Sequence, residues 1–175
     1  MTEDVNVVVG EDEVSLLDIA GIDLANYDEY RLTVNPAGVY QFRILEAKLE
    51  AKEVTNKDDP SGSKIKKPAI SFEFEAQNCF ALTDDKLDPA GQIGVKHFEN
   101  FYINDGAKDL GRVKAFLVDI GMTGTGALND LLAQSQGIEF VCNLVNTKNK
   151  DNPDIVYANM KKPRTLEQFQ ADQAA

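Results

Sequence analysis

Lysines and aromatic residues are the side chains of this sequence whose spacing could support chemistry. Lys96, Phe98 and Tyr102 alternate along one stretch, and further lysines cluster near positions 64 and 148. Lysines contact phosphates and exposed rings stack on bases, so this combination is typical of proteins that bind single nucleic-acid strands. The predicted binding residues are Lys64, Lys66, Lys67, Lys96, Phe98, Tyr102, Lys148, Lys150, Tyr157 and Lys161.

The same residue types also have ordinary structural uses. Surface loops are commonly charged, and acids lie among the lysines of both loops, so charge alone does not identify a binding patch. Aromatic rings also build cores, which we expect for Phe72, Phe74 and Phe140. Phe98 and Tyr102 are either stacking platforms or core residues, and Phe80 and Tyr157 are the next stacking candidates.

No arrangement in the sequence predicts catalysis, a metal or a cofactor. His97 is the single histidine, and it has no serine or cysteine partner at the spacing of a known nucleophile motif. With Cys79 and Cys142 it cannot complete a tetrahedral zinc site. The acids of segment 84–88 lie in a loop rich in proline and glycine, where carboxylates are usually solvated. The glycine-rich run 121–126 has no lysine, so we interpret it as a linker. We therefore expect a protein that is not an enzyme.

Alternation at period two predicts the strands that position these residues. A first strand begins at Pro36 and a second at Pro68, and the polar segment 52–67 between them is predicted to be a loop. Each strand has one apolar face and one wet face, which suits an antiparallel sheet. Glu73 and Glu75 are predicted on the wet face of the second strand, where they oppose the binding of a polyanion.

The rest of the chain alternates between strand and helix patterns. A third strand, 95–103, has aromatic residues on both faces, so either one set lies outside the core or a bulge exchanges the faces. Thr165 is predicted to cap a single helical turn in a polar tail, after Pro163 ends the last strand. The other predicted elements are a helix at 107–120, a short helix at 127–136, and strands at 138–145 and 155–161.

This element order predicts a mainly β fold. Five strands with a helix between the third and fourth match an OB-fold-like Greek-key barrel, which binds oligonucleotides on its second and third strands and on the loops after strands one and four. A β-sandwich would need more strands, and a βαβ design more helices. We expect an acidic N-terminal arm at 1–35, the barrel at 36–164 and a polar tail at 165–175.

The net charge of −11 is concentrated in the arm. Residues 1–35 hold nine acids against Arg31, a net of −8, while the other 140 residues hold 20 acids and 17 bases. The arm also contains Leu16, Leu17 and Ile22, so we expect it to be partly ordered against the barrel. A fully flexible tail is the alternative.

The sequence predicts a cytoplasmic protein. No apolar run approaches the length of a membrane span, and the N-terminus lacks the pattern of a signal peptide. The two cysteines, Cys79 and Cys142, fit a reduced compartment without disulfides. Cys142 alternates with Phe140 and Leu144, which predicts a buried core thiol.

Three segments carry a resemblance to a known family. SLLDIAGIDLANYDEYR, PAGVYQFRILEAKLEAK with KPAISFEFE, and the run LGRVKAFLVDIGMTGTGALNDLLAQSQGIEFVCNLVNTKN together resemble bacteriophage single-stranded DNA-binding proteins of OB-fold type. The resemblance covers roughly residues 15–162. It implies sequence-independent, cooperative coating of exposed single strands during phage replication or recombination, in the cytoplasm of an infected host. It also implies contacts with phage replication or recombination proteins, and a homo-oligomer.

The chain departs from this family at its ends. Many members carry an acidic C-terminal tail that recruits partners, whereas the end of this chain has only Glu167 and Asp172 as acids. The acidic arm is N-terminal instead, so partner contacts are assigned to the arm. Two other functions remain open: an OB-like protein-interaction or virion structural module without DNA binding, and a DNA-processing nuclease, which the missing acid cluster disfavours.

Overall fold

The computed structural model describes residues 6–9, 12–15, 34–56 and 59–175. The chain divides into two compact units, Met1–Thr33 and Val34–Ala175. In the first unit, β1 (Asn6–Val9) pairs antiparallel with β2 (Asp12–Ser15). Leu16, Leu17 and Ile22, which we expected to lie on the barrel, fall outside the described residues.

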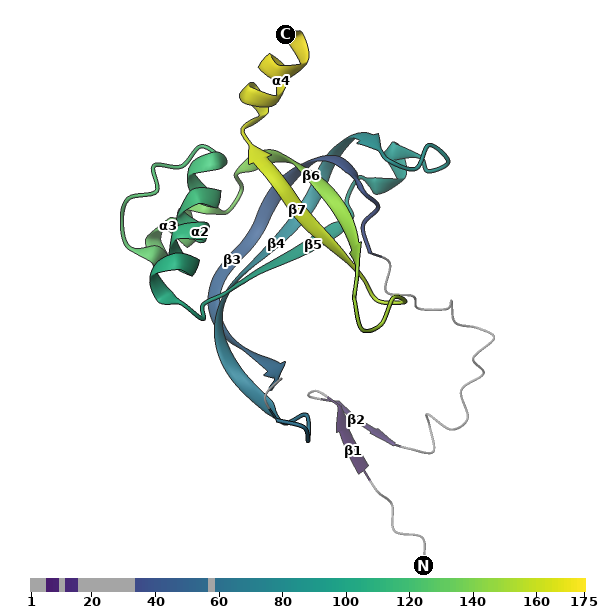
Figure 1. The fold of residues 1–175 in the computed structure, drawn as a ribbon, viewed down its shortest axis with the longest axis vertical. Helices are drawn as coiled ribbons and strands as arrows, with labels where there is room; N and C mark the ends of the chain where they lie inside the picture. The colour runs from purple at the N-terminus through teal and green to yellow at the C-terminus, as the bar shows by residue number, and fades with distance from the viewer. Residues whose placement is uncertain (1–5, 10–11, 16–33, 57–58) are drawn as a thin grey trace, which may run out of the picture. The chain divides into compact units, whose positions relative to one another are not determined.

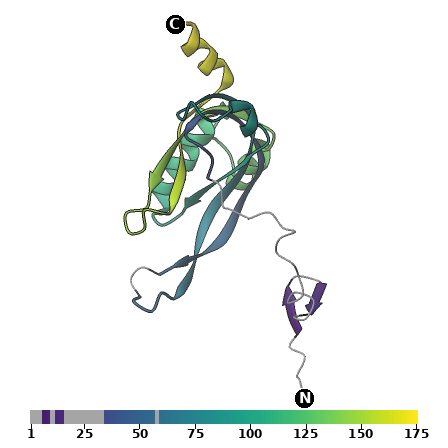
Figure 2. The same ribbon diagram turned by 90° about the vertical axis from the view of Figure 1, so that its right-hand side faces the viewer.

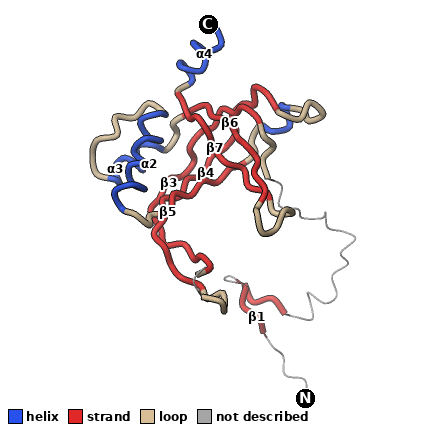
Figure 3. Tube along the Cα trace, in the orientation of Figure 1, coloured by secondary structure: helices blue, strands red, loops and turns tan. Residues whose placement is uncertain are grey.

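The second unit contains one antiparallel sheet of five strands (Figures 1 and 3). Its order is β5-β4-β3-β6-β7, so the two long strands β3 and β4 lie at its centre with β6. The strands are β3 (Gly38–Thr55), β4 (Lys64–Leu82), β5 (Lys96–Tyr102), β6 (Glu139–Lys148) and β7 (Val156–Arg164). The prediction of a mainly β protein is therefore confirmed.

In the described residues, four short helical elements accompany the sheet: the 3₁₀ turn η2 (Pro89–Gln92) and the helices α2 (Gly106–Asp119), α3 (Leu128–Ser135) and α4 (Leu166–Ala174). The helices α2 and α3 connect the third and fourth strands of the sheet, as the sequence predicted. Figure 2 shows the β3–β4 hairpin extending from one end of this unit and α4 from the other. In the part of the chain that the structure describes, no helix is long and apolar enough to cross a membrane.

The core is built on one face of the sheet. Phe42, Phe74 and Phe140 are fully buried there, and Phe116 of α2 packs on them with ring centroids 5.6 Å from Phe140 and 6.1 Å from Phe74. The amphipathic helix thus covers the apolar face that period two predicted. Phe72 and Cys142 are also buried, which confirms both as core residues. We call this the core face of the sheet.

A β-bulge in β3 allows one long strand to serve two regions. The register shifts between Ile44 and Glu46, so Leu45 is the extra residue and the alternation reverses after it. Ala47 is buried in place of Glu46, and the strand continues as a two-stranded hairpin with β4. This reversal interrupts the alternation of apolar residues in segment 36–54.

The predicted loop at 52–67 is too long. β3 and β4 remain paired to Thr55 and Lys64, and Asn56 N donates to Ser63 O at 2.8 Å to close the turn. Pro68 does not open β4 but lies inside it, opposite Ala51. Polar residues obscured this part of the hairpin because neither of its faces packs into the core, so its alternation has no continuous apolar side.

Two predictions near the C-terminus are also wrong. β7 does not end before Pro163 but continues to Arg164, because β7 is an edge strand, where a missing N–H is tolerated. Lys162 has a positive φ of 49°, and the register with β6 shifts there, so the strand passes the proline with an irregularity. The tail forms the full helix α4 rather than one turn, although Thr165 is its N-cap as predicted, in a capping box with Gln168.

Candidate nucleic-acid interface

The second face of the sheet, opposite the core face, carries the aromatic residues predicted to stack. We call it the outer face; on β3, β4 and β5 it consists of Glu46, Lys48, Glu50, Lys52, Val54, Ile65, Lys67, Ala69, Ser71, Glu73, Glu75, Lys96, Phe98, Asn100 and Tyr102. β5 pairs with β4 without a register shift, so its alternation is regular. His97 and Phe101 point to the core face, while Phe98 and Tyr102 lie on the outer face. The ambiguity of the third strand is thereby resolved without a bulge.

Phe98 is the most exposed large apolar side chain in the described residues, with 61% of its surface accessible. Its inward neighbour His97 is 5% exposed and stacks against Phe42 and Phe74, with ring centroids 5.8 and 6.1 Å away. Since a ring exposed on a strand contributes little to the core, Phe98 is free to stack on a ligand. Packing within the protein does not explain why a large aromatic residue stands at position 98.

Acids surround the Phe98 end of the outer face. Glu73 lies directly opposite Phe98, and Lys96 Nζ is 2.5 Å from Glu73 Oε1. The hydrogen bond to Glu73 and its negative charge raise the pKa of Lys96 above its usual value. Glu75 lies opposite Lys96, so the two glutamates are on the outer face as predicted. At this end Lys96 is largely neutralised, which leaves the Phe98 ring as the main feature that could attract a base.

The opposite end of the outer face is cationic. Lys52 and Lys67 lie directly opposite each other on β3 and β4. Lys52 Nζ is 3.1 Å from Glu50 Oε1, whereas Lys67 Nζ donates to the uncharged amide oxygen of Asn104 at 3.0 Å. Between the two ends, Ser71 Oγ donates to Asn100 Oδ1 at 2.8 Å. The outer face therefore changes from acidic to basic toward the hairpin.

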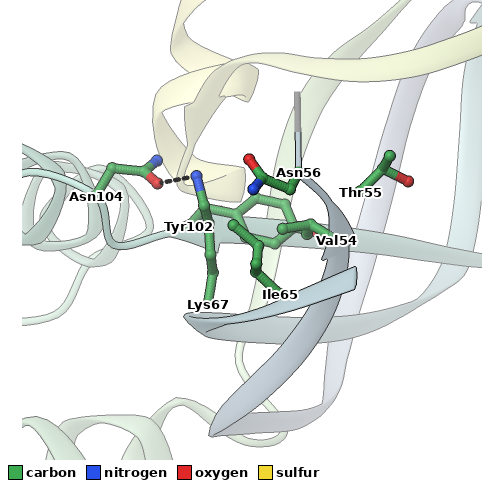
Figure 4. A pocket seen from close by; sticks show the side chains of 7 residues that line it. All are labelled: Val54, Thr55, Asn56, Ile65, Lys67, Tyr102 and Asn104. Atoms are coloured by element: carbon green, nitrogen blue, oxygen red, sulfur yellow. Dashed lines mark hydrogen bonds between the residues drawn. The ribbon is translucent and has the colours of Figure 1, made fainter. Parts of the chain in front are cut away.

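A cavity of about 490 Å³ adjoins this cationic end. Figure 4 shows its lining side chains, with the Tyr102 ring behind Val54 and Ile65, and the hydrogen bond of Lys67 to Asn104 at one side. The lining residues are Val54, Thr55, Asn56, Ile65, Lys67, Tyr102 and Asn104. We call this the hairpin cavity.

Asn104 is held in place by the start of α2. Asp109 Oδ2 accepts hydrogen bonds from the backbone N–H groups of Asn104 and Asp105, both at 2.8 Å. The bonds from Asp105 and Asn104 lower the pKa of the Asp109 carboxyl, so it stays ionised. This anchored turn fixes one wall of the hairpin cavity.

Other predicted lysines of the hairpin do not reach this surface. Lys64 and Lys66 lie on the core-face side of the β3–β4 ribbon, opposite Thr55 and Glu53. Lys64 Nζ donates to Thr55 Oγ1 at 3.0 Å. Of the three neighbouring lysines in β4, only Lys67 lies on the outer face with Tyr102.

The predicted residues of β6 and β7 form a separate group. The register places Leu144 beside Gly38, so the β6–β7 turn and the β3–β4 turn lie at opposite ends of β3. Tyr157 and Lys161 share the side of β7 that faces away from the core, and Tyr157 is 49% exposed. Its hydroxyl accepts a hydrogen bond from Asn149 Nδ2 at 3.0 Å. Lys148 and Lys150 are exposed at and after the end of β6.

Phe80 is already occupied within the protein. Its ring centroid is 4.6 Å from that of Phe169 of α4, and the guanidinium of Arg164, the last residue of β7, lies 5.1 Å from the Phe169 centroid. We therefore interpret Phe80 as the residue on which α4 packs. Only Tyr157 remains of the two secondary stacking candidates.

Sequence reasoning missed Asn100, Asn104 and the hairpin cavity. Asn100 was detectable, because it alternates with Phe98 and Tyr102 on β5. The cavity had no signal in the sequence, because the residues that line it from β3 and β4 were assigned to a loop.

The described residues contain no group of three or more His, Cys, Asp or Glu side chains that could hold a metal ion. Both cysteines are buried free thiols. Burial raises the pKa of the Cys142 thiol, which keeps it protonated.

Neither the protein-family models nor the curated proteins contain a match to this chain.

Proposed function

We propose that this chain binds single-stranded DNA, largely without sequence preference, on the outer face of β5 and the adjoining hairpin. The observation that carries the proposal is Phe98, a large apolar ring that is 61% exposed on the outer face of β5. A ring in this position can stack on any base, because every base has a π-face. The cationic end with Lys67 supplies a contact for the phosphate backbone.

We also propose that the sheet belongs to an OB-type barrel. Its order β5-β4-β3-β6-β7 supports this, because the first strand of the sheet pairs with the second and the fourth, and the helices follow the third. In OB-folds the ligand lies on the second and third strands, between the loops after strands one and four. Those elements here are β4, β5 and the turns after β3 and β6.

The biological setting that we propose rests on the resemblance to phage single-stranded DNA-binding proteins. The protein coats exposed strands in phage replication or recombination, in the cytoplasm of the infected host. Its acidic arm contacts other replication or recombination proteins. Binding to adjacent copies of the chain makes the coating cooperative.

The protein is expected to bind oligo(dT) more tightly than duplex DNA of the same length. Duplex bases are paired and stacked, and their faces are not available to Phe98. The logarithm of the affinity should fall with the logarithm of the salt concentration, with a slope of roughly −2 to −4 for three to five phosphate contacts at about 0.7 each. Fluorescence anisotropy at several salt concentrations measures both quantities. Equal affinity for the two DNA forms, or a slope of zero, would contradict the proposal.

The acids around Phe98 favour a second candidate, an OB-like protein-interaction or virion structural module. Lys96 is paired with Glu73, so this end of the outer face is also suited to a basic protein partner. The anisotropy experiment separates the two functions, because a protein-interaction module would show no salt-dependent affinity for oligo(dT). An exposed aromatic ring beside acids is then a contact for a protein side chain.

Deletion of residues 1–33 is expected to tighten DNA binding at low salt. The arm carries a net charge of −8, which repels the DNA backbone. The gain should shrink as salt rises, because the Debye length falls from about 30 Å at 0.01 M to about 8 Å at 0.15 M. Titration of oligo(dT) into the full chain and into residues 34–175 tests this. If the shortened chain binds no better at any salt concentration, the arm does not oppose DNA binding.

A further inference from the structure

The hairpin cavity has the composition of a site for one nucleotide. Its volume of about 490 Å³ lies in the range of small-molecule pockets. Tyr102 supplies an aromatic face, and Val54 and Ile65 supply aliphatic contacts on the same side of the hairpin. Lys67 and Asn104 place a charge and an amide beside this apolar surface. A site for a nucleotide needs an apolar surface for the base and a nearby cation for the phosphate, and this cavity has both.

The charge distribution at the cavity favours an anion. Like charges directly opposite each other on neighbouring strands are destabilising, yet Lys52 faces Lys67. Lys48, Lys52 and Lys96 of the outer face each lie within 4 Å of a carboxylate. Lys67, by contrast, donates to a neutral amide, so its positive charge is not balanced by that partner.

The cavity also lies on the same strand and the same face as the proposed stacking site. Phe98 and Tyr102 lie four residues apart on the same face of one strand, which corresponds to about 13 Å. Even at the rise of about 3.4 Å per nucleotide in B-form DNA, no more than about four nucleotides cover that distance. A strand that stacks on Phe98 and runs toward the hairpin therefore reaches Tyr102 within a few nucleotides.

We infer that the hairpin cavity holds one unpaired nucleotide of the bound strand, with its base against Tyr102 and its phosphate on Lys67. This inference rests on the proposed function and adds a second contact site to it. A base inside the cavity cannot remain in a duplex, because it must first leave its stack. The cavity therefore contributes to the selection of single strands.

A single-tryptophan reporter tests the site directly. The chain contains no tryptophan, so Tyr102→Trp would introduce the only one. Its fluorescence is expected to be quenched when oligo(dT) binds, because the indole then stacks on a base. Leu49→Trp is the matched control, because Leu49 is 50% exposed on the same hairpin but lies on the core-face side. Its fluorescence should not change.

Affinity measurements provide the second readout. Tyr102→Ala is expected to weaken oligo(dT) binding about 5- to 150-fold, which corresponds to the loss of about 1–3 kcal/mol for one stacked base. Lys67→Ala should reduce the salt slope by about 0.7, the share of one phosphate contact. Lys86→Ala, an exposed lysine in the loop after β4, should leave the slope unchanged.

The outcomes separate this inference from the proposed function. If the unmodified protein binds oligo(dT) and Phe98→Trp is quenched while Tyr102→Trp is not, the cavity holds no base and only the inference is overturned. If the unmodified protein does not bind oligo(dT), the proposed function fails and the inference fails with it. If Tyr102→Trp melts well below the unmodified protein, the test is the salt slope of oligo(dT) binding in Lys67→Ala compared with that in Lys86→Ala. Equal slopes in these two variants overturn the inference.

Discussion

Replacing Phe74 with alanine is expected to lower the free energy of unfolding by about 3–5 kcal/mol. Phe74 is fully buried, and its ring lies 5.1 Å from that of Phe140, 5.8 Å from Phe72 and 5.9 Å from Phe42, centroid to centroid. Phe116 of α2 packs on the same ring at 6.1 Å. The substitution removes a ring from the centre of this cluster and leaves a cavity that the surrounding strands cannot fill.

Chemical denaturation followed by circular dichroism measures this loss. Phe98→Ala is the matched control, since it removes the same side chain from the next strand but from the exposed outer face. Surface substitutions usually change stability by less than about 0.5 kcal/mol. Similar losses in both variants would show that Phe98 also belongs to the core and would contradict the assignment of the two faces.

Period-two alternation predicted the core correctly because one face of β4 is buried from Ile70 to Ala76. Phe72, Phe74 and Ala76 follow one another there without interruption. The bulge at Leu45 was not predictable in the same way. An extra residue exchanges the two faces of the strand that follows it, and the sequence of β3 alone does not show where this exchange occurs. Which residue is bulged depends on the register with β4, and that is a property of the pair.

The length of the β3–β4 hairpin escaped prediction for a different reason. Beyond Leu49 neither face of the ribbon is buried in the core, so lysines and glutamates replace most of the apolar side chains that reveal a strand. Backbone pairing, from Glu50 opposite Ala69 to Thr55 opposite Lys64, holds the ribbon together. The alternation of apolar and polar residues marks a strand only where one of its faces is buried, so a solvated hairpin is not detected by it.

The candidate site was predictable in its residue types but not in its grouping. The sequence indicated Phe98 and Tyr102 as a pair, and the regular register of β5 places both on the outer face. It could not separate Lys67 from Lys66, because neighbouring residues of an unrecognised strand have no assigned faces. The grouping of Lys67 with Tyr102 and Asn104 follows from the hairpin and from the turn before α2.

Replacing Phe98 with alanine is expected to weaken binding to oligo(dT) about 5- to 150-fold while the melting temperature stays close to that of the unmodified protein. The removed ring is 61% exposed and would contribute about 1–3 kcal/mol per stacked base. Because stacking releases no counterions, affinity should fall equally at all salt concentrations and the salt slope should not change. Anisotropy titrations at several salt concentrations, with a melting curve for each variant, give all three quantities.

Ile93→Ala is the control for a general loss of exposed apolar surface. Ile93 is 55% exposed in the loop between β4 and β5, outside the strands that form the outer face, and its removal should leave both affinity and slope unchanged. If Phe98→Ala binds oligo(dT) as tightly as the unmodified protein, Phe98 is not the stacking platform. Tyr157, 49% exposed on β7, would then be the aromatic residue with the strongest case, and the binding face would shift from β5 to the other edge of the sheet.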